Sequence, residues 1–274
     1  SNKKYHDRYS LAYPDPIVLE YPYYYRNESP LDTEEGYINY LKNTLSNINA
    51  SEIAAIIIEP VIGEGGYIPA PTNVLKILRD WCSETGVLLI FDEIQSGIGR
   101  TGEWFYFQHH GVEPDILTTA KGIASGLPLG ACISSQSIMD QWTTGSHGGT
   151  YGGNPLSCVA GSATLSVIDP LLPTIRDLGN FAFDTLTREL ENCPFIGNIR
   201  GKGLMIGIEF VLDDLKTPAP NFVKQVLKQC LEHQLLIVSC GTHGNVIRLM
   251  PPLTISKNEL IDGLTTFINI CQQL

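Results

Sequence analysis

The chain has 274 residues, of which 43% are hydrophobic and 17% charged, enough apolar material for one large core or for two domains of ~150 residues each. Its 29 acidic and 18 basic side chains give a formal net charge of -11, and no run of lysine and arginine occurs. This charge balance argues against an electrostatic surface for nucleic acid or for anionic membranes. Small molecules are therefore the expected partners.

Seven cysteines are scattered along the chain without a CxxC pair. Their odd number and the absence of zinc-ligand spacing argue against a disulfide framework and against a metal site. No stretch approaches the ~18 consecutive apolar residues of a membrane span, and Ser1-Asn2-Lys3-Lys4 is not a signal peptide. We expect a soluble protein of a reducing cytoplasm, with the loss of a targeting segment left open.

Residues 1–31, which are rich in tyrosine and proline, predict an extended loop. From there on, apolar residues at helical spacing alternate with short, continuous apolar runs. The predicted elements are, in order, a helix at 32–48, a strand at 53–58, a helix at 71–84, and strands at 87–91, 116–119 and 130–134. Continuous apolar strands between helices indicate an α/β fold, with an open, mainly parallel sheet that helices cover on both faces.

The pattern changes after Asn154-Pro155, where residues 156–168 predict one long helix that a break at Asp169-Pro170 ends. We place a domain boundary there, between a large domain at 1–169 and a smaller α+β domain at 170–274. The predicted elements of the smaller domain are a helix at 173–192, a strand-turn-strand stretch at 196–210, a helix at 221–233, short strands around 236–238 and 246–249, and a helix at 257–272.

Two side chains of chemical interest follow predicted strands. Asp92 comes after the strand at 87–91, at the carboxyl edge where open α/β sheets bind ligands. A carboxylate there needs a cation or a strong donor, such as a protonated pyridine nitrogen, so a ligand contact and a structural hydrogen bond remain equally open. Lys121 follows the strand at 116–119 and should lie over the same crevice. Burial would make its amine a nucleophile for carbonyls, although a solvated lysine is the commoner case at a strand end.

Four motifs stand out from the rest of the sequence. They are Glu59-Pro60-Val61 with Gly63-Glu64-Gly65-Gly66, the block at 91–102, Thr119-Ala120-Lys121-Gly122, and the glycine-rich run at 147–155. In this order and spacing, they resemble the class III (omega) aminotransferases, which depend on pyridoxal 5'-phosphate (PLP). The resemblance covers the whole chain and looks closest to 4-aminobutyrate aminotransferases. It implies PLP fold type I with a smaller C-terminal domain.

By position, the resemblance makes Lys121 the residue that holds the cofactor as a Schiff base and shuttles the proton of the reaction. Asp92 would pair with the pyridine nitrogen and keep it protonated, so that the ring withdraws electrons. Gln95 would hydrogen-bond the phenolic oxygen of the cofactor, and Ile94 would pack on one face of the ring.

The resemblance also assigns the substrate and the partner subunit. Thr150 resembles the residue that reaches the phosphate of the cofactor in the other subunit, which implies a homodimer. Arg248 matches the arginine that binds a substrate carboxylate with two hydrogen bonds. Glu64 matches the acid that pairs with this arginine when the substrate brings no α-carboxylate there.

The family pattern also has an N-terminal part, before the region that matches residues 4–6, with a phosphate-binding turn and an aromatic ring stack. This sequence lacks it, so we expect either a portion of a longer protein or a truncated relative. The leading expectation is transfer of an amino group from an ω-amino acid, such as 4-aminobutyrate, to 2-oxoglutarate. The alternatives are a PLP-dependent amino-acid racemase or epimerase, and a truncated relative without catalysis.

Overall fold

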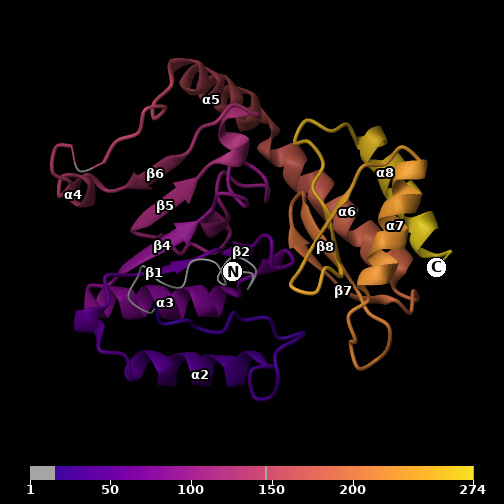
Figure 1. Ribbon diagram of the computed structural model, residues 1–274, viewed down its shortest axis with the longest axis horizontal. Helices are drawn as coiled ribbons and strands as arrows, with labels where there is room; N and C mark the ends of the chain where they lie inside the picture. The colour runs from indigo at the N-terminus through magenta and orange to yellow at the C-terminus, as the bar shows by residue number, and fades with distance from the viewer. Residues whose placement is uncertain (1–15, 146, 274) are drawn as a thin grey trace.

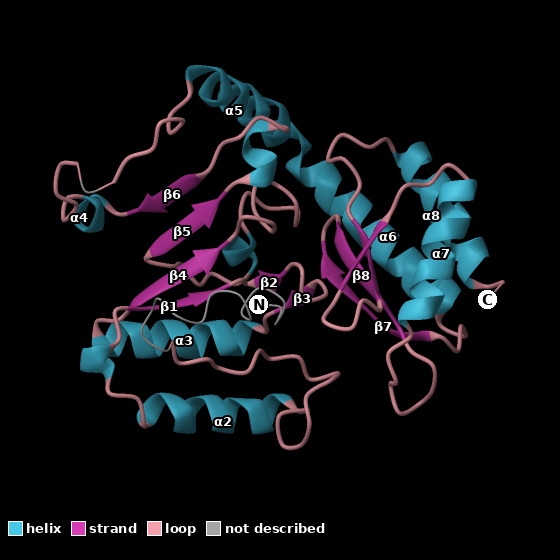
Figure 2. Cartoon of the chain, viewed as in Figure 1, coloured by secondary structure: helices cyan, strands magenta, loops and turns pink. Residues whose placement is uncertain are grey.

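The computed structural model describes residues 16–145 and 147–273. Their elements form two four-stranded sheets that lie side by side, each with helices packed against it (Figure 1). One long helical run connects the two halves (Figure 2). The division predicted at residues 169 and 170 falls within this run and stays a prediction.

The first sheet has the order β1-β4-β5-β6. Its strands are β1 (Ala55–Ile58), β4 (Leu88–Asp92), β5 (Ile116–Thr119) and β6 (Ala131–Ser134). The first three are parallel, and only β6 is antiparallel to its neighbour. This mainly parallel, mixed sheet confirms the predicted α/β class.

Two helices cover one face of this sheet. They are α2 (Glu34–Ser46), which Thr33 caps, and α3 (Thr72–Thr85), which ends at Gly86 in the left-handed conformation with φ of 77°. α3 packs against β4, and α2 packs against α3 (Figure 2). Ile56 and Ile58 pack against the core that these helices form, so Ile57 points to the opposite face and is 65% exposed. The described residues therefore leave that face of β1 open, whereas we expected helices on both faces.

Shorter elements lie at both edges of this sheet. They are η1 (Ala50–Glu52), the two-stranded β2 (Val61–Ile62) and β3 (Ile68–Pro69), η2 (Tyr106–His109), η3 (Lys121–Ala124) and α4 (Gln136–Met139). Of these, η1 and α4 lie at the amino ends of its parallel strands. η3 begins at Lys121, directly beyond β5.

The predicted helix break at Asp169-Pro170 is wrong. α5 (Pro155–Ile168) continues through the short η4 (Asp169–Leu171) into α6 (Leu172–Leu190). Pro170 lies in η4, a short 3-10 turn that carries the helix past the one backbone N–H that proline lacks. By length and composition alone, the run Pro155–Leu190 is apolar enough to cross a membrane, but core helices of soluble proteins meet the same criterion, so this is weak evidence.

The second sheet is antiparallel, with the order β7-β8-β10-β9. Its strands are β7 (Ile196–Lys202), β8 (Met205–Phe210), β9 (Val238–Cys240) and β10 (Val246–Leu249), and its helices are α6, α7 (Pro220–Glu232) and α8 (Lys257–Cys271). The helices bury one face of the sheet around Phe210 and Phe267. The strand expected around 236–238 lies two residues later, at β9.

Candidate active site

The polar side chains singled out in the first sheet lie where its parallel strands end. Glu59 follows β1, Asp92 ends β4, and Lys121 comes two residues after β5. The register of the parallel pair β4–β5 sets Asp92 beside Thr118, three residues before Lys121. Because parallel strands end at the same edge, the fold brings these three groups to one crevice.

Lys121 has an unusual backbone. Its φ is 46°, in the left-handed region that a side chain with a Cβ adopts at a cost of about 1–3 kcal/mol. Such strain gathers at functional sites. The residue is exposed, and its amine makes no hydrogen bond or ion pair with the described residues. The turn therefore holds out a free amine at the edge of the sheet.

Asp92 is half-buried and oriented by its own turn. Its Oδ1 accepts a hydrogen bond from the backbone N–H of Ile94 at 3.1 Å. No described residue donates to Oδ2, which leaves one carboxylate oxygen for a ligand. Ile94 and Gln95, both half-buried, follow in the same turn.

Glu93 is a residue whose role sequence reasoning missed. Its fully buried carboxylate accepts hydrogen bonds from the backbone N–H groups of Tyr106 at 2.6 Å and Phe107 at 3.0 Å, and from Ser96 Oγ at 3.0 Å. These bonds tie the Asp92 turn to η2. Because side chains alternate along a strand, the sequence predicts that Asp92 and Glu93 point to opposite sides. It does not show which of the two sides is the crevice.

Gln95 is held tightly against the loop that carries Glu64. A Cβ on Gly63 would lie 2.6 Å from Gln95 Oε1, so a larger residue at position 63 would displace the amide of Gln95. Gln95 Oε1 is itself buried without a hydrogen-bond partner among the described residues. A buried acceptor without a partner costs about 1–3 kcal/mol, which a ligand hydroxyl would recover.

Glu64 and Arg248 form an ion pair across the two sheets. Arg248 Nη1 in β10 donates to Glu64 Oε1 at 2.5 Å, and the side chains are 17% and 48% exposed, respectively. Burial raises the pKa of Glu64, but the hydrogen bond and the charge of Arg248 outweigh it and hold that pKa below its ordinary value. Arg248 Nε is buried and has no partner among the described residues. The guanidinium thus binds the carboxylate of Glu64.

Thr150 lies apart from these residues within one chain. It is exposed and belongs to the connection between α4 and α5, which extends away from β4 and β5 (Figure 1). The fold of a single chain therefore does not bring Thr150 together with Lys121 and Asp92.

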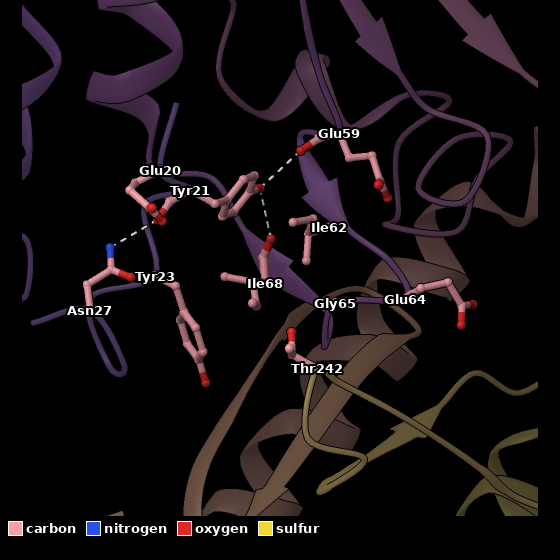
Figure 3. Close-up of a pocket in the computed structure, with 10 residues that line it drawn as sticks. All are labelled: Glu20, Tyr21, Tyr23, Asn27, Glu59, Ile62, Glu64, Gly65, Ile68 and Thr242. Carbon is pink, nitrogen blue, oxygen red and sulfur yellow. Dashed lines mark hydrogen bonds between the residues drawn. The ribbon is translucent and has the colours of Figure 1, made fainter. Parts of the chain in front are cut away.

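A cavity of about 350 Å³ borders the Glu64 loop (Figure 3). Tyr21 and Tyr23 from the N-terminal segment line one side, and Glu59 and Glu64 lie on the other. Tyr21 donates hydrogen bonds to the backbone oxygens of Glu59 and Ile68, both at 3.0 Å. The tyrosine-rich run, expected only to form a loop, is therefore a wall of the site region.

Comparison with known proteins identifies the family. The profile of the aminotransferase class-III family matches residues 1–271, so the chain belongs to this family. It is 41% identical to the 4-aminobutyrate aminotransferase of Mycobacterium leprae, over 79% of this chain and 49% of the relative. It is 39% identical to the acetylornithine aminotransferase of Clostridium acetobutylicum, over 91% of this chain and 63% of the relative. The chain thus spans about half to two-thirds of these relatives.

Solved structures agree with this assignment. An amine transaminase from an uncultivated Pseudomonas species, solved in its PLP-bound form, superposes with a TM-score of 0.89 at 32% identity and covers 99% of this chain and 65% of that protein. The fold is therefore that of the PLP-dependent aminotransferases of fold type I. The cofactor of this family is pyridoxal 5'-phosphate.

The described residues fit this cofactor. Lys121 supplies a free amine, Asp92 an unpaired carboxylate oxygen for a protonated ring nitrogen, and Gln95 a buried acceptor for a hydroxyl. The three groups come from two adjacent strand ends, at the edge where this class of sheet binds ligands.

Glu93 predicts a specific pH dependence of stability. The pKa of its carboxyl is raised from 4.5 to about 7, mainly because the group is buried. The folded chain therefore binds this proton more tightly than the unfolded chain does, so the contribution of Glu93 to the free energy of unfolding falls as pH rises from 4.5 to about 7. Urea unfolding should show that the stability of the parent relative to Glu93→Gln declines across this window. Glu52→Gln, at an exposed carboxyl, serves as the control, and parallel pH curves for the parent and Glu93→Gln would contradict the prediction.

Proposed function

We propose that the complete protein transfers an amino group from an ω-amino acid similar to 4-aminobutyrate to 2-oxoglutarate. Membership of the class III aminotransferases supports the reaction type. The observation that carries the choice of substrates is the Glu64–Arg248 ion pair, because a substrate carboxylate would replace that of Glu64 on the guanidinium.

The residues at the sheet edge divide the chemistry between them. When bound, PLP supplies a carbonyl that condenses with amines and a ring that withdraws electrons. Asp92 would hold the proton on the ring nitrogen through its free Oδ2. Lys121 would anchor the cofactor through Nζ and, once a substrate amine displaces it, would take up and return the substrate proton at the same atom.

Arg248 and Glu64 would let one site accept two kinds of substrate. Glutamate and 2-oxoglutarate bring an α-carboxylate that can pair with Arg248. An ω-amino acid brings none at that point and would leave a largely buried guanidinium unpaired, at a cost of several kcal/mol. Glu64 is 48% exposed, free enough to turn aside for the dicarboxylate and to return for the ω-amino acid.

The exposed surface of α5 supports a homodimer as part of this proposal. Leu156, Val159 and Val167 are 75%, 70% and 52% exposed, and Tyr151 in the preceding turn is 85% exposed. A contiguous apolar surface of this kind is typical of a protein interface. Thr150 lies in the same exposed turn, so a second subunit seated there would bring Thr150 to the cofactor of its partner.

The cysteines support a reducing compartment, and we propose a cytoplasmic location. All seven are free, and Cys132 and Cys158 are exposed. Exposed thiols persist where glutathione and thioredoxin keep them reduced.

Lys121→Ala in the complete protein tests the reaction. Glutamate formation from 2-oxoglutarate should be abolished while the far-UV circular dichroism spectrum stays that of the parent, since the lysine acts in the chemistry and is not packed in the core. Borohydride reduction of the parent, followed by peptide mapping, should place the cofactor on Lys121. A label on Lys202 would refute the assignment, and a parent that racemises the donor without forming glutamate would favour the racemase alternative.

Glu64 and Arg248 would together switch the site between the two kinds of substrate. Replacing each of them should therefore affect the two reactions in opposite ways. Glu64→Ala should slow the reaction with the ω-amino donor far more than the reaction with glutamate, because Arg248 then stays unpaired only with the donor. Arg248→Ala should do the reverse, since the α-carboxylate loses its partner. Single-turnover absorbance with each substrate separates the two reactions. Equal losses in both would mean that Glu64 and Arg248 form a structural ion pair only.

Mixing two defective subunits tests the role of Thr150. Lys121→Ala subunits are inactive, and Thr150→Ala subunits should bind PLP weakly. A mixed dimer has one site with Lys121 from one subunit and Thr150 from the other, so unfolding and refolding the two variants together should restore activity. Refolding each variant alone is the control. No recovery after mixing, with mixed dimers verified by native mass spectrometry, would show that Thr150 does not serve the partner subunit.

A further inference from the structure

A buried arginine outside the residues discussed so far holds the loop that carries Glu64. Arg200 in β7 is 8% exposed. Its Nε and Nη2 both donate to the backbone oxygen of Gly66, at 2.9 and 2.7 Å. Two hydrogen bonds from one rigid guanidinium to one oxygen fix the position of that peptide.

The guanidinium of Arg200 is itself held in place by acceptors on its Nη1 atom. Its Nη1 donates to Glu209 Oε2 at 2.7 Å and to Asn198 Oδ1 at 3.0 Å. Burial raises the pKa of Glu209, but Arg200 and the hydrogen bonds from Tyr23 and Arg26 outweigh it and hold that pKa below its ordinary value. Glu209 is therefore a buried anion that holds the guanidinium of Arg200 in place.

The backbone of the Glu64 loop packs closely against the second sheet. Gly66 has φ of 130°, and a Cβ there would lie 2.9 Å from Arg200 Nη2. The backbone oxygen of Glu64 accepts a hydrogen bond from Gly241 N–H at 2.9 Å. The peptide after Glu64 is thus tied to the turn that follows β9, and the peptide after Gly66 is tied to β7. The carboxylate of Glu64 remains the movable part.

Arg200 and Arg248 belong to the same sheet, separated by β8. Arg248 holds the carboxylate of Glu64, whereas Arg200 holds the backbone two residues later. We propose that Arg200 is a positioning residue that keeps Glu64 opposite Arg248 and so sets the preference for amino donors without an α-carboxylate. This inference rests on the switch in the proposed function and assigns the residue that aligns it.

Arg200→Lys in the complete, PLP-loaded protein tests this inference. Lysine keeps the charge beside Glu209 but cannot donate two hydrogen bonds in a fixed plane to Gly66. The single-turnover rate with the ω-amino donor should fall about tenfold, since about 1.4 kcal/mol is the smaller end of what a charge-assisted hydrogen bond contributes. The rate with glutamate should change less than about twofold, because Arg248 then pairs with the substrate itself.

Two further measurements separate positioning from a merely structural role. Arg176→Lys is the matched control, because Arg176 also binds a glycine oxygen and a glutamate, at Gly102 and Glu103, away from Glu64. It should change neither reaction selectively. Hydrogen exchange, read by mass spectrometry, should quicken in residues 62–68 of Arg200→Lys and stay unchanged in α3.

The double variant decides whether Arg200 acts through Glu64. In a Glu64→Ala background, Arg200→Lys should cause no further selective loss. An additional selective loss there, or equal losses of both reactions in Arg200→Lys alone, overturns the inference. If Glu64→Ala shows no selective effect, the proposed role of Glu64 and Arg248 in substrate choice is refuted, and this inference is refuted with it. A selective effect of Glu64→Ala without one of Arg200→Lys overturns this inference alone.

Discussion

The parallel pairing of β1, β4 and β5 is the constraint on which the candidate site depends. Parallel strands end at one edge, so residues 59, 92 and 121, which are far apart in sequence, meet there. The strands are short and apolar, and the polar groups come only where each strand ends. The side chains of β1 and β4 that pack with α2 and α3 stabilise this edge, at which the reactive groups stay accessible.

The second sheet completes the site from the other side. It contributes no residue to the proposed cofactor chemistry, but it holds the Glu64 loop through Arg200 and Arg248, and Gly241 directly after β9 adds a third contact. Two of these contacts fix the backbone and one contacts a movable carboxylate. A loop with a fixed backbone and one exposed side chain would suit the proposed exchange of two substrates, because only that side chain would have to reorganise between them.

The sequence predicted the elements well where local pattern decides the structure. Continuous apolar runs located β1, β4 and β5. The ion pair of Glu64 with Arg248, which the family resemblance implied, is present, and the roles of Asp92 and Lys121 stay predictions. Pro170 misled us, because a proline that ends one helix pattern can equally lie in a short 3-10 turn that leads into the next helix. Its effect depends on the backbone that follows, which apolar periodicity does not reveal.

Long-range contacts explain what the sequence could not predict. Arg200 resembles any arginine on a strand, and its role depends on Gly66, 134 positions earlier in the chain. Asp92 and Glu93 are adjacent acids, yet one faces the crevice and the other is buried under three donated hydrogen bonds. The two acids therefore differ in what they can do because their surroundings differ. Glu93, buried and bonded to three donors, holds the turn in place. Asp92 has a free oxygen at the end of the strand and can bind a cation.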